Sequence, residues 1–153
     1  MPRKRLFKYI ALSITLLSSI AAAAYVLTRP TLEDIAITNT IAKLKDNLRD
    51  PDSLKLIDVY TVRKNDESKS IAVCGFFDSK NAFGGYSGKT RFRSLVHNYS
   101  ESSSKKVQLA FEDELIKEYA DKVGKNSVFV QAAWNYDCVD ENHPEIKPPP
   151  RSD

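Results

Sequence analysis

Two cysteines and two histidines are the residues of this chain best suited to chemistry. Cys74 and Cys138 are the only cysteines, and His97 and His143 are the only histidines. Thiolates and imidazoles can bind zinc, but these four residues have no recognised ligand spacing. Neither histidine lies in a frame that marks a serine or cysteine nucleophile, such as G-x-S-x-G. The sequence therefore predicts no catalytic residue, no metal site and no cofactor.

A glycine-rich segment is the second candidate site. Four of the five glycines fall between positions 74 and 88, which indicates a backbone that residues with a Cβ tolerate poorly. The segment has neither a P-loop nor a G-x-G-x-x-G spacing. Two interpretations remain: an exposed recognition loop with aromatic and basic side chains, or a structural turn whose aromatics fold onto the core. The candidate binding residues are Asn81, Phe83, Gly84, Gly85, Tyr86, Lys89, Arg91 and Arg93.

The positive charge of the chain is concentrated at its N-terminus. The 153 residues carry a formal net charge of +3, and five of the 23 bases precede the first acid, Glu33. The remaining 18 bases face 20 acids, a balance of about −2. A nucleic-acid-binding surface needs a basic domain, so no nucleic acid is expected as a partner.

The same N-terminal segment carries an export signal. Positions 1–8 form a basic region, and positions 9–28 are uncharged and mostly apolar. About 20 such residues can cross a bilayer as a helix, with the basic flank left in the cytoplasm. Two interpretations stay open: a retained transmembrane anchor, or a signal peptide cleaved near the alanines at 21–24. We expect an inner-membrane protein with a periplasmic C-terminal domain, or a free periplasmic protein if the signal is cleaved.

Positions 31–142 are predicted to form one α+β domain, with an antiparallel sheet of three or four strands packed by two or three helices. Helices are expected over 31–49 and 112–123, and strands over 54–63, 70–77, 90–96 and 107–111. The first strand should place on one face Leu54, Leu56, Asp58, Tyr60 and Val62. The second helix should bury Leu115, Ile116, Tyr119 and Val123. Positions 127–139 fit a strand or a helix, with the helix favoured, and 143–153 should be a flexible proline-rich tail.

Export places the two cysteines in an oxidising compartment, where a disulfide is expected. A bridge from Cys74 to Cys138 would tie the second strand to the C-terminal segment. It would contribute about 3–4 kcal/mol in the chain-entropy model. The alternative is two buried free thiols.

Two motifs resemble those of a group of small bacterial and phage-encoded exported proteins. The first is L-x-D-P-D-S at 48–53, and the second is C-G followed by N-x-F-G-G-Y-x-G within 74–88, with Phe92 beyond it. The stretch from Trp134 to Cys138 also resembles that group's closing cysteine. The resemblance implies a signal-bearing cell-envelope protein and transfers no catalytic residue.

These features support three hypotheses for function. The leading one is a non-enzymatic envelope module, tethered or exported, that binds another protein as an inhibitor, immunity factor or accessory factor. The second is a small envelope enzyme, such as a cell-wall or carbohydrate hydrolase, which needs a pocket that brings together His97 or acids such as Asp78 and Asp137. The third is a structural envelope component that self-associates through the small residues of the apolar segment.

Overall fold

The computed structural model describes residues 18, 25, 29–63, 70–97 and 106–150. The chain divides into two units, Met1–Thr31 and Leu32–Asp153. The basic region 1–8 and all but two residues of the apolar segment 9–28 lie outside the described residues. Within the part of the chain that is described, none of the helices combines the length and the apolar composition needed to cross a bilayer.

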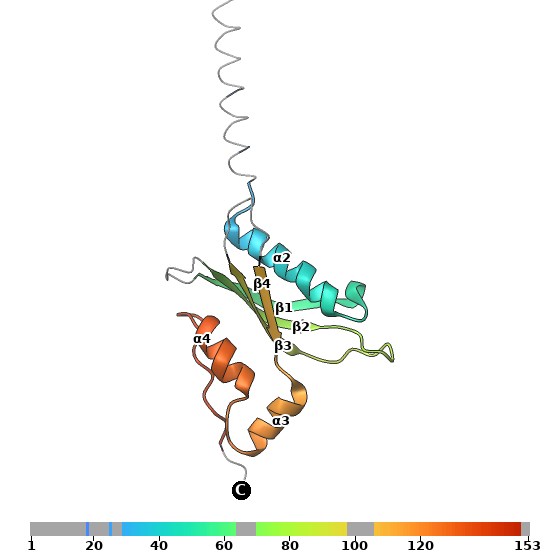
Figure 1. Cartoon of the computed structure of the whole chain (residues 1–153), viewed down its shortest axis with the longest axis vertical. Helices are drawn as coiled ribbons and strands as arrows, with labels where there is room; N and C mark the ends of the chain where they lie inside the picture. The colour runs from blue at the N-terminus through green and yellow to red at the C-terminus, as the bar shows by residue number, and fades with distance from the viewer. Residues whose placement is uncertain (1–17, 19–24, 26–28, 64–69, 98–105, 151–153) are drawn as a thin grey trace, which may run out of the picture. The chain divides into compact units, whose positions relative to one another are not determined.

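The second unit has the predicted α+β architecture, built on one antiparallel sheet (Figure 1). Its four strands pair in chain order, β1-β2-β3-β4. The elements are α2 (Leu32–Asn47), η1 (Pro51–Ser53), β1 (Lys55–Arg63), β2 (Ile71–Asp78), β3 (Thr90–His97), β4 (Lys106–Phe111), α3 (Glu114–Lys122), η2 (Val130–Trp134) and α4 (Asn135–Asp137). Residues 128–137 are helical throughout, so the ambiguous segment is a helix, as favoured. We call these residues the C-terminal helix; they contain η2 and α4.

The sheet is covered on both faces, which creates two apolar cores. One core lies against α2 and contains Ala36, Leu44, Ile71, Val73, Phe77, Phe92 and Val96. The other lies against the C-terminal helix and contains Val62, Ala72, Cys74, Trp134 and Cys138. Because side chains alternate along a strand, β2 sends odd-numbered residues to the first core and even-numbered residues to the second. This double burial explains the nearly continuous apolar sequence of β2.

The helix α2 packs through a slightly different stripe from the predicted one. The sequence pattern placed Ile37, Ile41, Leu44 and Leu48 on the buried face. The fully buried positions are instead Ala36, Thr40 and Leu44, with Ile37 and Leu48 at the margin. The small side chains at 36 and 40 lie against the sheet, where the Thr40 hydroxyl donates to Ser94 Oγ at 2.9 Å.

The predicted disulfide is present. Cys74 on β2 is bonded to Cys138, with 5.8 Å between the Cα atoms. Both residues are fully buried. The bridge joins the sheet to the end of the C-terminal helix across a sequence separation of 64 residues.

The predicted alternation of β1 is wrong, because the strand contains a β-bulge. Leu56 pairs with Phe77 and Tyr60 pairs with Cys74, which leaves the pairing register shifted between Ile57 and Tyr60. Asp58 takes a positive φ of 49° there, and the extra residue inverts the alternation. Leu54 therefore packs with the first core, whereas Tyr60 and Val62 pack with the second.

The opposing strand carries a glycine that this bulge requires. A Cβ on Gly75 would lie 3.0 Å from both the Asp58 carbonyl oxygen and the Val59 Cα. Both contacts are to backbone atoms, which cannot move aside as a flexible side chain would. Glycine at this position therefore lets the bulged strand approach β2.

The predicted burial of α3 is also wrong. Leu115 is 77% exposed, Tyr119 69% and Ile116 50%, and of the helix residues only Ala120 is buried. Glu112, just before the helix, is paired with Arg91 of β3 at 2.5 Å. The charged side chains of the helix are exposed as well, since Lys117, Glu118, Asp121 and Lys122 lie between 46% and 69% exposure.

The proline-rich segment is attached to the domain at Ile146 rather than frayed throughout. The Asn135 side chain accepts from the Ile146 amide and donates to its carbonyl oxygen, both at 3.0 Å. Asn126 donates to the same carbonyl at 2.7 Å. The Ile146 side chain packs against the second core. Two asparagines thus satisfy a backbone that the prolines around it exclude from regular structure.

Candidate functional site

The glycine-rich segment forms a protruding hairpin between β2 and β3. We call residues 79–88 the β2–β3 hairpin. Lys80 and Tyr86 form an isolated antiparallel bridge, and the Ser87 amide donates to the Ser79 carbonyl at 3.0 Å. The two strands are therefore extended past their ends before the chain turns.

Asn81 fixes the turn at the tip. Its amide donates to the Gly85 carbonyl at 2.8 Å, and its carbonyl accepts from Gly84 at 3.1 Å. Its side-chain Oδ1 accepts from the amides of Phe83 (2.9 Å) and Gly85 (3.2 Å). Gly84 has a φ of +80°, which lies in the left-handed region that glycine adopts readily. Because these amides already donate within the hairpin, they cannot cradle a ligand, and the turn is held in one shape.

The two motifs behind the family resemblance meet at the base of this hairpin. Ser53, the last residue of L-x-D-P-D-S, is buried. Its hydroxyl donates to the Asp50 carbonyl at 2.7 Å and accepts from the Lys80 amide at 2.9 Å. At the other arm, Asp78 Oδ1 accepts from the Gly88 amide at 2.9 Å. The turn after α2 therefore anchors the hairpin to the domain.

The two aromatic residues of the hairpin have different environments. Phe83 at the tip is 96% exposed. Tyr86 is partly covered, with Lys55 Nζ 3.7 Å from its ring centroid, a cation–π contact. Of the two interpretations of the segment, exposed anchor and aromatic folded onto the core, Phe83 fits the first, whereas Tyr86 is 42% exposed, lies against Lys55 and joins neither core. Lys89 lies just beyond, 3.2 Å from Asp58 Oδ2.

Arg91 and Arg93 are largely buried beside Glu112 and the C-terminal helix, and they do not lie on the surface of the hairpin. Arg93 Nη2 is 2.5 Å from Asp137 Oδ2, and their side chains are only 15% and 3% exposed. Arg91 Nη1 is 2.5 Å from Glu112 Oε2, and the Ser127 hydroxyl donates to the other oxygen of Glu112 at 2.7 Å. Two largely buried ion pairs thus join β3 to Glu112 and to Asp137, which gives both arginines a structural role. The sequence could have indicated this role, because the two arginines alternate on a central strand, where a buried positive charge needs an acidic partner.

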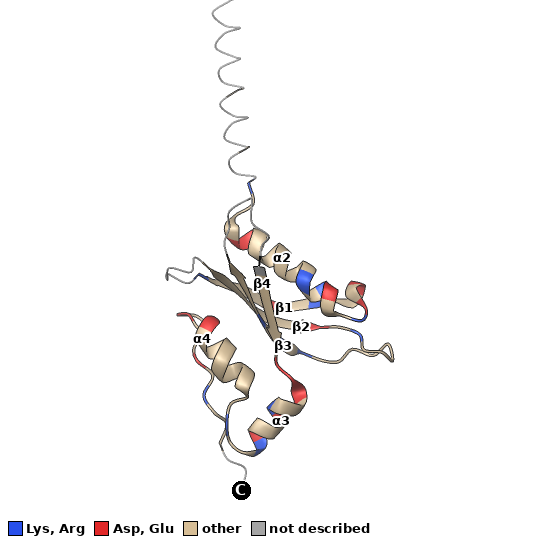
Figure 2. Cartoon of the chain, viewed as in Figure 1, with Lys and Arg blue, Asp and Glu red and all other residues tan. Residues whose placement is uncertain are grey.

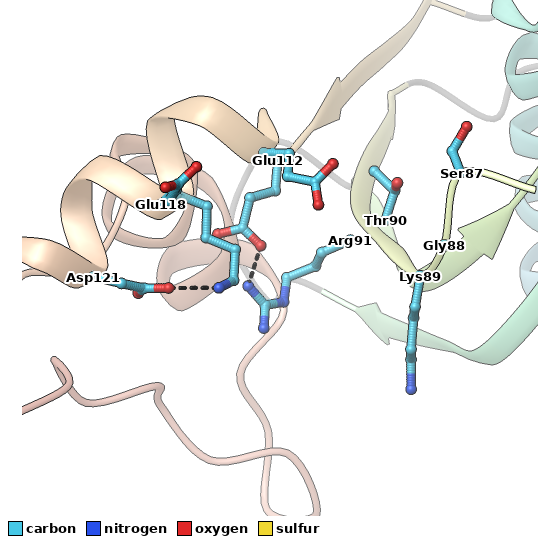
Figure 3. Close-up of a pocket in the computed structure, with 10 residues that line it drawn as sticks. Ser87, Gly88, Lys89, Thr90, Arg91, Glu112, Glu118 and Asp121 are labelled. Atoms are coloured by element: carbon cyan, nitrogen blue, oxygen red, sulfur yellow. Dashed lines mark hydrogen bonds and ion pairs between the residues drawn. The ribbon is translucent and has the colours of Figure 1, made fainter. Parts of the chain in front are cut away.

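A charged groove of about 430 Å³ separates the end of the hairpin from α3 (Figure 3). Residues 87–91 form one side, and Lys117, Glu118 and Asp121 of α3 contribute to the other. The hydrogen bond to Asp121, 2.6 Å long, raises the pKa of Lys117 above its usual value. Arg91, Lys117 and Glu118 each have an oppositely charged partner within the chain, so the groove exerts little net attraction on a charged ligand.

The groups named for the enzyme hypothesis, His97 and the acids Asp78 and Asp137, do not lie together. Asp78 ends β2 and His97 ends β3. In the antiparallel register Phe77 pairs with Thr90 and Ile71 with Val96, so these two residues lie at opposite ends of the paired strands. Asp137 is buried against Arg93. Among the described residues, no three His, Cys, Asp or Glu side chains gather as a metal site would require.

The other histidine, His143, holds the segment after the C-terminal helix against β1. The His143 ring stacks on Tyr60 with 3.5 Å between ring centroids, and its Nδ1 lies 2.8 Å from Asp140 Oδ1. The Tyr60 hydroxyl donates to the Cys138 carbonyl at 2.7 Å. Burial, followed by the nearby charge of Asp140, raises the pKa of Tyr60 to about 12.

Comparison with known proteins adds no functional assignment. No family model, curated protein or solved structure matches the chain. The function is therefore inferred from the geometry of the β2–β3 hairpin and its supports.

Proposed function

We propose that this protein is a non-enzymatic, extracytoplasmic binding module that presents the β2–β3 hairpin to another envelope protein. The observation that carries the proposal is the 96% exposure of Phe83 at the tip of a hairpin fixed by Asn81. An apolar ring held in water by a rigid turn gains free energy when a partner buries it. Because the turn is already ordered, binding loses little conformational entropy.

The chemistry around the hairpin suggests what the partner offers. Lys55 and Lys80 lie beside the Tyr86 ring, and Lys89 follows the hairpin. An apolar pocket for the Phe83 ring with an acidic rim would match this arrangement. Aromatic residues in pockets contribute much of the binding energy in protein interfaces, whereas rim charges mainly affect the association rate.

The location rests on the sequence and the disulfide. A fully buried disulfide suits an oxidising compartment, in agreement with the export signal predicted at 1–28. The resemblance to small exported envelope proteins points the same way. Inhibitor, immunity factor and accessory factor all remain versions of the proposed role.

The test is affinity capture of the full-length, C-terminally tagged chain from its native envelope, with three variants. Phe83→Ala should abolish capture of a specific partner, because it removes the anchor without touching the core. Asn81→Ala should weaken capture, because it releases two amides of the turn. Val128→Ala is the matched control, since Val128 is also an exposed apolar residue but lies on the C-terminal helix.

The variants make the outcome specific to the hairpin. Loss of the same partner in Phe83→Ala, with capture retained in Val128→Ala, supports the proposal. A partner that binds Phe83→Ala and the unchanged chain equally would show that recognition lies elsewhere on the molecule.

A further inference from the structure

A short segment beside the C-terminal helix is held to the domain by few contacts. We call residues 144–149 the strap; they form no regular structure and run beside the C-terminal helix (Figure 1). The strap is attached at Ile146, whose side chain packs against the second core. Its exposed residues are Pro144, Glu145, Lys147 and Pro148. One residue therefore supplies most of the attachment of the strap to the domain.

Two side-chain amides hold the backbone of Ile146. Asn135 accepts from its N–H and donates to its carbonyl oxygen, both at 3.0 Å, and Asn126 donates to the same oxygen at 2.7 Å. These bonds involve only backbone atoms of the strap, so every residue except proline, which lacks the N–H, could form them. In peptide recognition, such backbone hydrogen bonds supply affinity and a pocket for a side chain supplies selectivity. The groove thus accepts an extended segment with one aliphatic side chain at the position of Ile146.

The wall that the C-terminal helix contributes to this groove is neutral. No residue from 127 to 136 is charged, and Figure 2 shows this stretch in tan. The one further contact there is from the Asn135 amide to Oε1 of the exposed Glu145, at 3.2 Å. At this wall an occupant is therefore selected by its backbone and its apolar side chain rather than by ion pairs.

The groove is held in shape by contacts that do not involve the strap. The disulfide of Cys138 with Cys74 joins the end of the C-terminal helix to β2, and the ion pair of Asp137 with Arg93 joins it to β3. Both attachments precede the strap in the chain. Asn135 is three residues from the disulfide, so we expect it to stay in place when the strap leaves.

The strap also leaves space unfilled beside it. An open cavity of about 500 Å³ adjoins Pro148, and one of about 180 Å³ adjoins Pro149. Asn126 and Asn135 both line the larger cavity. A segment with larger side chains at the positions of these prolines would cover more of the groove than the strap does.

We propose that this groove is a peptide-binding site, that the strap is its internal ligand, and that an extended segment of a partner protein with one aliphatic anchor displaces the strap. Seven residues separate Cys138 from Ile146, and so short a tether gives the strap an effective concentration on the order of millimolar. The strap thus closes the groove to weakly binding peptides. This inference does not depend on the proposed function, because the groove contains no residue of the β2–β3 hairpin.

The test is fluorescence anisotropy with the full-length chain in mild detergent. The probe is a fluorescein-labelled synthetic peptide with the sequence of residues 143–150. Ile146→Asp removes the anchor of the strap, so this variant should bind the probe at least about tenfold more tightly than the unchanged chain does. Ile146→Val is the matched control, since it keeps an aliphatic anchor and should bind the probe like the unchanged chain.

Two further measurements test the groove itself. Adding Asn135→Ala to Ile146→Asp should weaken probe binding about tenfold, because two hydrogen bonds to the peptide backbone are lost. A probe with aspartate in place of its isoleucine should not bind. In the unchanged chain, hydrogen exchange should be at least about tenfold faster at the Ile146 amide than at the Cys138 amide, which donates to Trp134 within the domain.

Several results would overturn the proposal: equal probe binding by Ile146→Asp and the unchanged chain, equal binding of the two probes, no effect of Asn135→Ala, or equal exchange rates at Ile146 and Cys138. Unfolding of Ile146→Asp, followed by Trp134 fluorescence, would also overturn it, because the groove would then need the strap. A dimer of the unchanged chain that Ile146→Asp dissociates would contradict the role of a partner protein, since straps would be exchanged between copies. Capture of an envelope protein by the hairpin is a separate result, so the two proposals can fail independently.

Discussion

Replacing only one partner of the buried ion pair between Arg93 and Asp137 should strongly destabilise the protein. Both side chains are largely removed from water, at 15% and 3% exposure. Replacing either one leaves an uncompensated charge in the second core. Such losses cost about 3–5 kcal/mol, a large part of the roughly 5–15 kcal/mol that holds a domain folded.

A double-mutant cycle separates this effect from simple loss of packing. Arg93→Met and Asp137→Leu should each lower the free energy of unfolding by about 3–5 kcal/mol. The double variant should lose less than either single one, because no isolated charge remains. Lys117→Met is the matched control. Its ion pair with Asp121 is exposed, so the cost should be under about 1 kcal/mol.

The assay is guanidinium unfolding of the full-length chain in mild detergent. Trp134 is the only tryptophan, is buried and lies in the second core, so its fluorescence reports this layer directly. A loss of 3–5 kcal/mol should shift the midpoint by about 1 M. If Arg93→Met unfolds within about 1 kcal/mol of the unchanged chain, Arg93 is not structural, and the binding role predicted from the sequence regains its support.

Three further predictions test the disulfide, the bulge and the contacts of Tyr60. Replacing both cysteines by alanine should lower the free energy of unfolding by about 4 kcal/mol for a separation of 64 residues. Reductant should lower the unfolding midpoint of the unchanged chain but not that of the variant, and an equal midpoint of the unchanged chain with and without reductant would contradict this. Gly75→Ala should cost about 1–3 kcal/mol in the same assay, whereas Gly85→Ala, whose nearest contact would be 3.8 Å away, should change stability by under about 0.5 kcal/mol; equal effects would refute the bulge contact. The raised pKa of Tyr60 favours the protonated phenol in the folded state, so its stabilising contribution is complete below pH 10 and is lost as the pH rises from 10.0 to about 12. Tyr60→Phe should flatten this alkaline decline, and an unchanged pH profile would count against the linkage.

Much of the fold follows from local sequence patterns. All four strands were predicted, the first from alternation and the second from its β-forming residues, and the apolar spacing predicted α2. The helix ends at Asn47, two residues before the predicted end at Arg49, and Pro51 begins the turn that follows. The disulfide followed from having two cysteines beside an export signal.

The exceptions share a physical cause, since each depends on contacts distant in sequence. The bulge at Asp58 left two traces in the sequence: a charged residue on an otherwise apolar face of β1, and the glycine at 75 on the opposing strand. The amphipathic pattern of α3 identifies an apolar side but not the direction in which that side points. The ion pair just before the helix joins Glu112 to Arg91, 21 residues earlier in the chain, and the local pattern does not reveal it.

In the candidate site, too, local contacts could be predicted and distant ones could not. The tip of the hairpin could be predicted, because Asn81 and the glycines form hydrogen bonds within the hairpin itself. Its supports, Ser53 and Lys55, lie about 30 residues away in the chain and were not among the predicted binding residues. Arg91 and Arg93 were predicted as binding residues because they follow the aromatic loop, and their acidic partners became evident only in the folded chain.

The central claim is that Phe83 on the β2–β3 hairpin contacts another envelope protein. The most direct measurement is mass-spectrometric identification of what a benzophenone side chain at position 83 crosslinks in living cells, compared with the same probe at position 128. We expect one protein other than this chain at position 83, absent at position 128 and reduced when Asn81→Ala loosens the turn. The same products at both positions, or none at position 83, would contradict the claim.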